Sequence, residues 1–525
     1  MADVISLAEP TPEDLQRTTE LEKVLASSNV LEDPSEREHR KQILAKLNAL
    51  FRQWVRDVSI AQNKPEAVAD KLGGTIYPFG SYRLGAYDKN ADIDVVCVAP
   101  RDVKRSDYFG SFFELLKRQP EVTWCQALED ATVPIIKINF DGIEFDLLFI
   151  KLALAKVPDN FDLFDDMLLD KADCHSKRNL NGVRVTEEIL RLVPDIDSFR
   201  LALRVIKLWA KSRGIYSSLM GYLGGISWTI LLARTCQLHP NATAATLVHN
   251  FFLVFSGWDW SQLVRLKQVG TVVSIKRSSL MPIITPVDPQ ENTAFKVSRS
   301  ARQMIIDELH RGKQVTDEIM LTKAAGWDKL FAAPSFFFKY RHFIVLLASS
   351  NNADDHRGWC GLVECRIITL IRDLECQPHI NFHVNPKRFE HPEHTSKERS
   401  DGEVKQLCSL WFIGLEFDKP ESSSVDLTKD IDRFTNRLPR NAESTMKIEA
   451  RRIGQEQLSQ YLQPNLLMRE TSPDVNSGTT TRKRLPSDDE QTAPAVQSKK
   501  AKTDSVISTT ASKSLRQRLL NTCNI

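Results

Sequence analysis

Three aspartates are candidates for chemistry because each enters an apolar, strand-like run of the sequence. Asp92 and Asp94 precede the run 95–98, and Asp146 stands in the run 144–150. Side chains two residues apart on a strand point to the same face, so Asp92 and Asp94 converge on one point. Burying two carboxylates together costs free energy unless a cation lies between them. The spacing therefore predicts a divalent-metal site, with Asp146 as a further candidate ligand.

A turn of small residues lies just upstream of these acids. Gly80 and Ser81 leave room and free backbone N–H groups for a phosphate. Taken singly, a Gly-Ser turn or an Asp-x-Asp strand end also suits an ordinary surface feature. Together, with ten residues between Ser81 and Asp92, they resemble the nucleotidyltransferase signature of the polymerase-β type. That signature requires a third carboxylate on a neighbouring strand, and Asp146 meets the requirement.

Local patterns predict the elements that position the acids. No regular structure is expected before about residue 30, and a capping box at residues 33–36 then starts an amphipathic helix. A second helix is predicted over 108–117 and a strand over 133–140. The turn pair Asp141-Gly142 reverses the chain after that strand, and this hairpin brings Asp146 back to the other acids.

The next part of the sequence, from about 185 to 330, is largely helical in pattern. It includes an apolar and basic segment over 198–212, with Lys207, and a glycine-rich turn over 221–228. That turn suits either a nucleotide contact at a helix start or a tight packing of two helices. Lys207 and Tyr216 likewise suit either a nucleotide site or ordinary roles, as a surface lysine and a core tyrosine.

The remainder of the chain predicts a small α+β unit and then a tail. A helix is expected over 361–374 and a strand over 408–417, without an aromatic RNA-stacking motif. Beyond about residue 465 the composition turns polar and loses its aromatic residues, which is typical of disorder. The basic clusters 482–484 and 499–502 have the spacing of a bipartite nuclear-import signal, although a tail that simply attracts nucleic acid would look similar.

The bulk composition is that of an ordinary soluble protein. The 525 residues are 42% hydrophobic and 26% charged, with a net charge of +2, which suits several domains with substantial cores. No apolar run is long enough for a membrane span, and the N-terminus lacks a signal-peptide pattern. The nine cysteines show no CxxC pair, so reduced thiols in the cytosol or nucleus are expected.

Over roughly residues 1–455 the chain resembles the eukaryotic nuclear-type poly(A) polymerases. The matching segments are colinear: 79–84, 91–100, 141–148, 180–186, 206–211, 222–228, 281–286 and 383–386. The resemblance implies an α+β fold with a polymerase-β-like nucleotidyltransferase palm, a helical central domain and an RRM-like RNA-binding domain. The expected boundaries are an N-terminal segment on the central domain (1–32), the catalytic domain (33–184), the central domain (185–338), the RNA-binding domain (339–455) and a basic tail (456–525).

The resemblance also implies the site residues and the chemistry. By position, Asp92, Asp94 and Asp146 match the metal ligands of the family. The positions matching its ATP contacts are Phe79, Gly80, Ser81, Asp88, Asn181, Lys207, Tyr216, Gly225 and Ile226. The implied reaction is template-independent transfer of AMP from ATP to RNA 3′ ends, with two Mg²⁺ or Mn²⁺ ions, in mRNA polyadenylation. The implied setting is a nuclear monomer, with pre-mRNA cleavage and polyadenylation factors as partners and no membrane.

One segment departs from the family pattern. Between Lys267 and Met281 this chain lacks a longer stretch with a Trp-Asp-Pro-Arg element that the family usually has. Other functions remain open at this stage. Uridylyl or CCA-adding transfer would use the same three acids, a small-molecule acceptor could replace RNA, and a non-catalytic RNA-binding scaffold could keep the fold.

Overall fold

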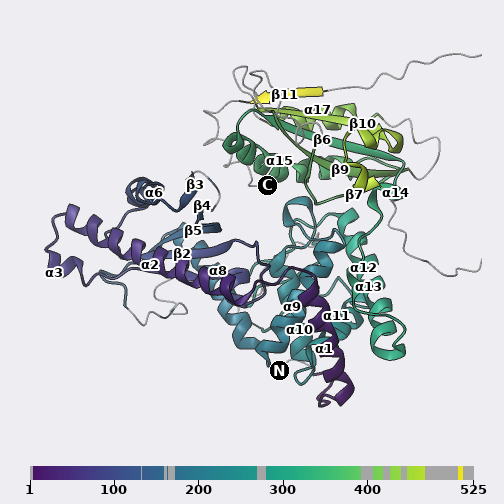
Figure 1. Cartoon of the computed structure of the whole chain (residues 1–525), viewed down its shortest axis with the longest axis horizontal. Helices are drawn as coiled ribbons and strands as arrows, with labels where there is room; N and C mark the ends of the chain where they lie inside the picture. The colour runs from purple at the N-terminus through teal and green to yellow at the C-terminus, as the bar shows by residue number, and fades with distance from the viewer. Residues whose placement is uncertain are drawn as a thin grey trace, which may run out of the picture.

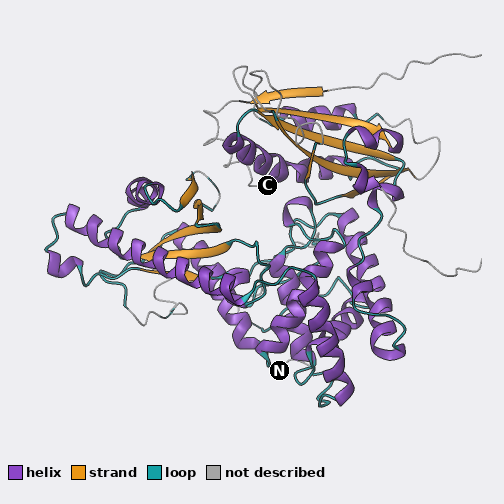
Figure 2. Ribbon diagram, in the orientation of Figure 1, coloured by secondary structure: helices purple, strands orange, loops and turns teal. Residues whose placement is uncertain are grey.

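The chain forms three packed units in a computed structural model (Figures 1 and 2). The structure describes residues 4–129, 131, 133–158, 162, 172–268, 279–391, 406–417, 426–438 and 446–467, and the backbone of 507–511. A sheet with helices comes first, a helical unit lies in the middle, and a second sheet with helices follows. The predicted α+β, three-domain fold is therefore confirmed.

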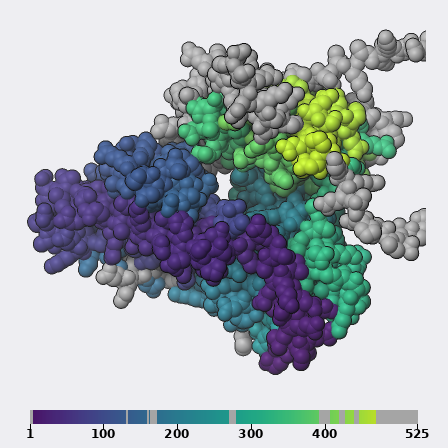
Figure 3. Space-filling view, viewed as in Figure 1, coloured from purple at the N-terminus to yellow at the C-terminus, as the bar shows by residue number. Residues whose placement is uncertain are grey.

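The N-terminal segment is helical, so the expectation of irregular structure there was wrong. Helix α1, Pro12–Ser27, starts at a capping box between Thr11 and Asp14, and buries Leu21 and Leu25 beside α11. Proline at the first turn misled the sequence interpretation, although this position suits proline well. Helix α2, Pro34–Ala61, starts where predicted, with Asp33 accepting from the backbone of Ser35 and Glu36. Figure 3 shows this purple segment along the front of the molecule.

The first unit, here called the palm, is built on a five-stranded sheet in the order β1-β2-β5-β4-β3. The strands are β1 Thr75–Pro78, β2 Ile93–Ala99, β3 Val122–Leu128, β4 Ile135–Phe140 and β5 Ile143–Lys151. Only β2 and β5 run parallel. The predicted turn at Asp141 and Gly142 joins β4 to β5, and both residues take a positive φ.

The two faces of the palm sheet are covered by different helices. Alternate residues of β2 and β5, such as Val95 and Leu147, pack against α2 and the helices after β2. The other face, with Val96 and Leu148, packs against α8. The short helices of the palm are α3 Glu66–Ala69, α4 Gly80–Leu84, α5 Arg105–Asp107, the π-helix η1 Tyr108–Phe112 and α6 Phe113–Lys117.

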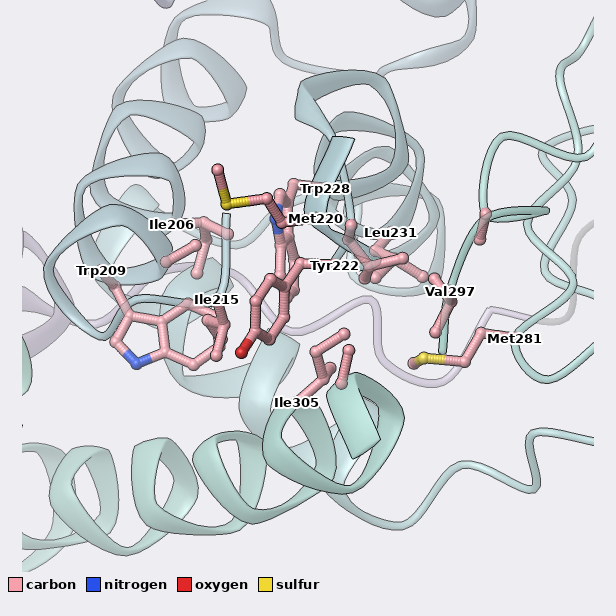
Figure 4. Packing of buried hydrophobic residues seen from close by; sticks show 14 of the residues in the cluster. Ile206, Trp209, Ile215, Met220, Tyr222, Trp228, Leu231, Met281, Val297 and Ile305 are labelled. Carbon is pink, nitrogen blue, oxygen red and sulfur yellow. The ribbon is translucent and has the colours of Figure 1, made fainter. Parts of the chain in front are cut away.

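The central unit is a bundle around a tryptophan-rich core. Its helices are α8 Cys174–Leu192, α9 Ile196–Ser212, η2 Ser218–Met220, α10 Gly225–Leu238, α11 Ala244–Ser256, α12 Arg299–Asp317, η3 Glu318–Thr322, α13 Asp328–Phe331 and α14 Phe336–Lys339. Trp209 of α9 meets Trp228 of α10 edge to face at 5.4 Å between ring centroids. Figure 4 shows Tyr222, Ile215 and Ile305 in this core. The segment between Lys267 and Met281, where the sequence departs from the family pattern, lies outside the described residues except for positions 268, 279 and 280.

The third unit has the βαββαβ order of an RRM-like fold. Its elements are β6 His342–Ser350, α15 Ala353–Leu374, β7 Ile380–Val384, β8 Phe389–Glu390, β9 Leu407–Phe417, α17 Thr428–Asn436 and β10 Met446–Gly454, followed by η5 Gln455–Gln460, η6 Pro464–Leu467 and β11 Ile507–Ala511. The sheet order is β11-β10-β6-β9-β7, with β8 also on β9. One face packs on α15 and α17 and merges with the central core.

The opposite face of this second sheet is covered as well. Phe343 and Phe412 on that face lie under aromatic residues of the segment 336–340 and under Leu458, Tyr461 and Leu462. The packed unit thus continues beyond residue 455, after which we expected the tail to begin. The reason is that residues 455–467 carry apolar side chains that this sheet face buries. The basic clusters of the tail lie outside the described residues.

Helices able to span a membrane are absent from the described part of the chain, where none is both long and apolar enough.

Candidate active site

The three aspartates come together through strand register. Strands β2 and β5 are parallel neighbours, and their register sets Asp94 directly opposite Asp146. Asp92 lies two residues before Asp94, just ahead of β2, and is exposed to solvent. Side chains paired in register point to one face of the sheet. The acids therefore share the face that α8 covers further along the strands, where Leu148 and Ile150 pack.

The electrostatics of the acids reflect their crowding. The pKa of Asp94 is raised to about 7, first by burial and then by the negative charges of Asp92 and Asp146. Burial also raises the pKa of Asp146, while the Lys137 ammonium opposes that change. Like charges held together in a partly desolvated place disfavour ionisation, and a bound cation would remove the penalty.

Lys137 supplies a cation to this cluster. Its Nζ donates to both carboxylate oxygens of Asp146, at 2.6 and 2.5 Å, from the facing position on β4. The sequence interpretation overlooked this lysine, although the signal was available. With Asp141 and Gly142 as the turn, a hairpin pairs residues at equal distances from it, which sets Lys137 opposite Asp146.

The carboxylates suit a hard divalent cation in type and in charge. Carboxylate oxygens are ligands that Mg²⁺ prefers, and an ammonium already stands against Asp146 as a positive partner. Within the described residues, however, no group of three or more acids, histidines or cysteines is already gathered tightly enough to hold a metal. The exposed Asp92 is the member with most freedom to close on an ion.

The predicted glycine turn lies directly against the acids. Gly80 begins α4 with φ +61°, and a Cβ built on it would lie 2.6 Å from Asp94 Oδ2. The Phe79 N–H donates to the Asp94 carbonyl at 2.9 Å, and the Gly80 N–H to Thr186 Oγ1 at 3.1 Å. Ser81 is half-buried beside them. The close approach of backbone to carboxylate is the reason for glycine at position 80.

A second wall of the site comes from the central unit. Lys207 of α9 is 7% exposed and donates to the Ala86 carbonyl at 2.6 Å. Burial, followed by the charge of Lys211, lowers the pKa of Lys207 to about 8, against the pull of Asp88. Lys211 forms an ion pair with Asp88 and lies 5.4 Å from the centre of the Tyr216 ring.

Tyr216 and the glycine-rich turn continue this wall. Burial and then the charges of Asp88, Asp92 and Asp94 raise the pKa of Tyr216 to about 12. Its hydroxyl lies 2.6 Å from a Cβ built on Gly225, the first residue of α10, and Ile226 follows. The turn thus has tight packing at its start, and it also adjoins the charged wall.

Asn181 lies on α8 next to Gly182, which the Phe79 ring approaches. Asn181 is 7% exposed, and its Oδ1 has no hydrogen-bond partner among the described residues. A buried, unpaired acceptor near a predicted ligand site is a candidate for receiving a donor from that ligand.

A separate cavity of about 390 Å³ lies between α9, α12 and the third unit. Its lining includes Arg213, Glu308 and His383, and none of the three aspartates. Arg213 forms a two-point ion pair with Glu308 there, at 2.8 and 2.7 Å. The cavity is therefore distinct from the acid cluster.

Family models cover nearly all of the described chain. The Poly(A) polymerase nucleotidyltransferase domain matches residues 1–193, the Poly(A) polymerase central domain residues 198–333, and the Poly(A) polymerase predicted RNA binding domain residues 335–406 and 390–472.

Three similar proteins from other organisms are named poly(A) polymerases. A poly(A) polymerase of Dictyostelium discoideum is 38% identical, covering 93% of this chain and 63% of that protein. Nuclear poly(A) polymerase 1 of Arabidopsis thaliana is 36% identical, with 83% and 62% covered. Poly(A) polymerase PAPa of Candida albicans is 36% identical, with 77% and 75% covered. The chain thus spans less than two thirds of the length of the first two relatives.

Among solved structures, the Cid1 poly(U) polymerase is similar with a TM-score of 0.42 and 15% identity, over 61% of this chain and 99% of that one. A likeness of this size supports no argument here.

Proposed function

The chain belongs to the poly(A) polymerase family, and from this premise we propose that it transfers AMP from ATP to the 3′ hydroxyl of RNA without a template. One observation carries the proposal: Asp94 and Asp146 face each other in register, on the side of the sheet where Gly80 approaches. Two carboxylates that face each other beside a glycine turn suit the metal-assisted transfer of a nucleotidyl group better than a role as surface residues.

Asp92, Asp94 and Asp146 are proposed to hold two Mg²⁺ or Mn²⁺ ions. When bound, such ions lower the pKa of the attacking hydroxyl and neutralise the pyrophosphate that leaves. Lys137 donates to both oxygens of Asp146, so a metal would bind this carboxylate through the lone pairs that the lysine leaves free, or after the lysine moves aside. A nearby triphosphate would then offer the ammonium a new anionic partner.

The nucleotide is proposed to lie between the palm turn and the α9–α10 wall. Ser81 contributes its hydroxyl and backbone N–H to the phosphates, Gly80 leaves room for them and adds its own N–H once that group turns away from Thr186 Oγ1, and Phe79 shapes the turn. Lys207 directs its ammonium at the triphosphate, and its three N–H donors let it do so while it keeps its bond to the Ala86 carbonyl. Tyr216 donates a hydrogen bond, because its raised pKa keeps the hydroxyl protonated.

The remaining contacts are proposed by position. Asp88 orients Lys211 through their ion pair, beside the Tyr216 ring. Asn181 offers its unpaired Oδ1 to a donor of the nucleotide. Gly225 and Ile226, at the start of α10, present their backbone to the nucleotide. We assign none of these groups as a bidentate reader of adenine and expect the base to be chosen by shape.

The wider setting is proposed on the same premise. The domains are taken as 33–184 catalytic, 185–338 central and 339–455 RNA-binding, with the segment 1–32 on the central domain and the tail from 456. Residues 455–467 are better grouped with the RNA-binding unit, because their apolar side chains pack there. A nuclear location is proposed from the basic tail clusters and the nuclear relative, with cleavage and polyadenylation factors as partners and a monomeric enzyme.

Primer extension tests the proposal directly. The full chain receives a short RNA primer with Mg²⁺ or Mn²⁺ and each of ATP, UTP, CTP and GTP in competition. We expect ATP-dependent extension that Asp92→Ala reduces on the order of 1,000-fold, because phosphoryl transfer depends on charge neutralisation at this point. Asp57→Ala on the exposed side of α2 is the matched control and should extend normally.

Three outcomes contradict parts of this assignment. Normal extension by Asp92→Ala, with its fold intact by circular dichroism, would rule out the acids as the active site. Preference for UTP would replace adenylyl by uridylyl transfer. Nucleotide transfer that needs no RNA would indicate a small-molecule acceptor.

A further inference from the structure

The acid-bearing face of the palm sheet continues beyond the acids to the edge strand β3. Asp146 pairs with Asp94 on one side and with Lys137 on the other, and Lys137 pairs in turn with Gln126 of β3. Residues paired in register share a face. Because neighbouring strands lie about 4.8 Å apart, this row extends about 14 Å from Asp94 to Gln126.

Trp124 stands on the same face as Gln126, at the open end of the sheet. It pairs with Asn139, and the register shifts between Val122 and Trp124, which leaves Thr123 outside the pairing. Such a bulge changes the direction of the side chains beside it. Trp124 is half-buried and belongs to none of the core clusters among the described residues.

A planar cation of the third unit lies on the Trp124 ring. The guanidinium carbon of Arg357, on α15, is 4.3 Å from the ring centroid. The Arg357 side chain is 45% exposed and is also 3.5 Å from Asp354. Figure 1 shows β3 on the side of the palm that is turned toward the third unit, and α15 on the side of the third unit that is turned toward the palm. The contact therefore joins the palm to the third unit, on the acid-bearing side of the sheet.

Base stacking on the third unit itself has little surface to use. RRM-type domains stack bases on the open face of their sheet, and here that face is buried under aromatic and leucine side chains. A single strand held near the acids can gain affinity from an aromatic platform elsewhere. Trp124 is aromatic, half-buried and on the same sheet face as the acids, and a guanidinium already lies on its ring.

We propose that Trp124 is a stacking platform for a base of the RNA strand, upstream of its 3′ terminus, and that Arg357 covers the ring until RNA enters. This inference rests on the proposed RNA substrate. ATP is a poorer occupant, because the proposed nucleotide wall of Lys207 and Tyr216 belongs to α9 and α10, away from β3. A single-stranded base suits an indole face through stacking of either purines or pyrimidines.

A fluorescent primer tests the platform without relying on turnover. Oligoadenylates carrying 2-aminopurine at successive upstream positions are bound to the full chain. We expect quenching at one upstream position, lost in Trp124→Ala and kept in Trp124→Phe. In extension assays, Trp124→Ala should raise the KM for primer about tenfold and leave the KM for ATP and the kcat at saturating primer unchanged. Trp258→Ala, a half-buried tryptophan of the central unit, is the control.

Combining Trp124→Ala with Arg357→Ala distinguishes a base-stacking platform from a purely structural contact between the two units, here called a latch. A platform predicts that Trp124→Ala still raises the primer KM about tenfold when Arg357 is absent. A latch predicts that Trp124→Ala has no further effect in that background, and this result would overturn the proposal, as would unchanged quenching in Trp124→Ala. Both readings leave AMP transfer by the wild-type chain intact, whereas failure of the proposed function would abolish it.

Discussion

At the scale of single residues, the site combines acids that resist ionisation with lysines that neutralise them. Asp94 has its pKa raised to about 7, and Lys137 stands on Asp146 at 2.5 Å. The ion pair between Lys137 and Asp146 therefore offsets part of the negative charge of the site. A metal ion would share the Asp146 carboxylate with Lys137 or displace it, and an anionic phosphate would give the lysine ammonium groups a further partner.

Lys207 leads to a pH-dependent prediction. Its pKa of about 8 means that the ammonium is charged below that pH and neutral above it. The Lys207 ammonium can therefore attract the triphosphate at lower pH, and this attraction is lost as the pH rises through about 8. We expect the KM for ATP to rise about tenfold above that pH, since a charged hydrogen bond is lost. Steady-state kinetics across this range measure the effect.

Two variants check that Lys207 is the cause. Lys207→Arg keeps its charge at high pH, so the rise in the KM for ATP should disappear. Lys207→Met lacks the charge throughout, so its KM should be high and independent of pH. A rise that persists in Lys207→Met would assign the effect to another group.

At the scale of elements, the start of the short helix α4 has a restrictive geometry. Gly80 begins it with φ +61°, and the nearest atom to an added Cβ is Asp94 Oδ2 at 2.6 Å. Gly80→Ala would push the carboxylate aside and strain the backbone. We expect extension activity to fall on the order of 100-fold, because small displacements of reacting groups are costly, and stability to fall by about 1 kcal/mol.

A glycine in open space serves as the control for Gly80. Gly361 lies inside α15, where an added Cβ meets nothing within 4 Å. Gly361→Ala should keep full activity and add about 1 kcal/mol of stability, because alanine favours helix. Activity retained in Gly80→Ala would mean that the Asp94 carboxylate moves without consequence, and would weaken its role as a ligand.

At the scale of the whole molecule, the third unit depends on a segment that the sequence assigned to the tail. Leu458, Tyr461 and Leu462 are at most 6% exposed and cover Phe343 and Phe412. A chain ending at residue 455 would leave part of that aromatic face open to water, since only the residues of 336–340 would still cover it. We expect it to lose several kcal/mol of stability and to bind hydrophobic dyes, because each large buried side chain contributes about 2 kcal/mol.

A chain ending at residue 467 is the matched comparison, since it retains the covering side chains. Thermal unfolding and dye fluorescence of the two shortened chains measure the difference. Equal unfolding temperatures would show that the covering segment contributes little, and the boundary at 455 would then stand.

Much of the fold and of the site could be predicted because it depends on local chemistry. The capping box of α2, the turn at Asp141 and Gly142, and the strand around Asp94 follow from residue types and spacing. The hairpin register even pairs Lys137 with Asp146. Local hydrogen bonds and side-chain periodicity encode such features within a few residues of sequence.

Tertiary structure alone decided what depends on packing between distant segments. The docking of α1 on α11, the burial of Leu458 against the second sheet, and the contact of Arg357 with Trp124 join residues far apart in the chain. No local pattern marks these partners, because apolar and aromatic side chains gain by burial against many different surfaces. The sequence by itself determined the acids and their strands; packing decided which surfaces remain open for RNA to reach them.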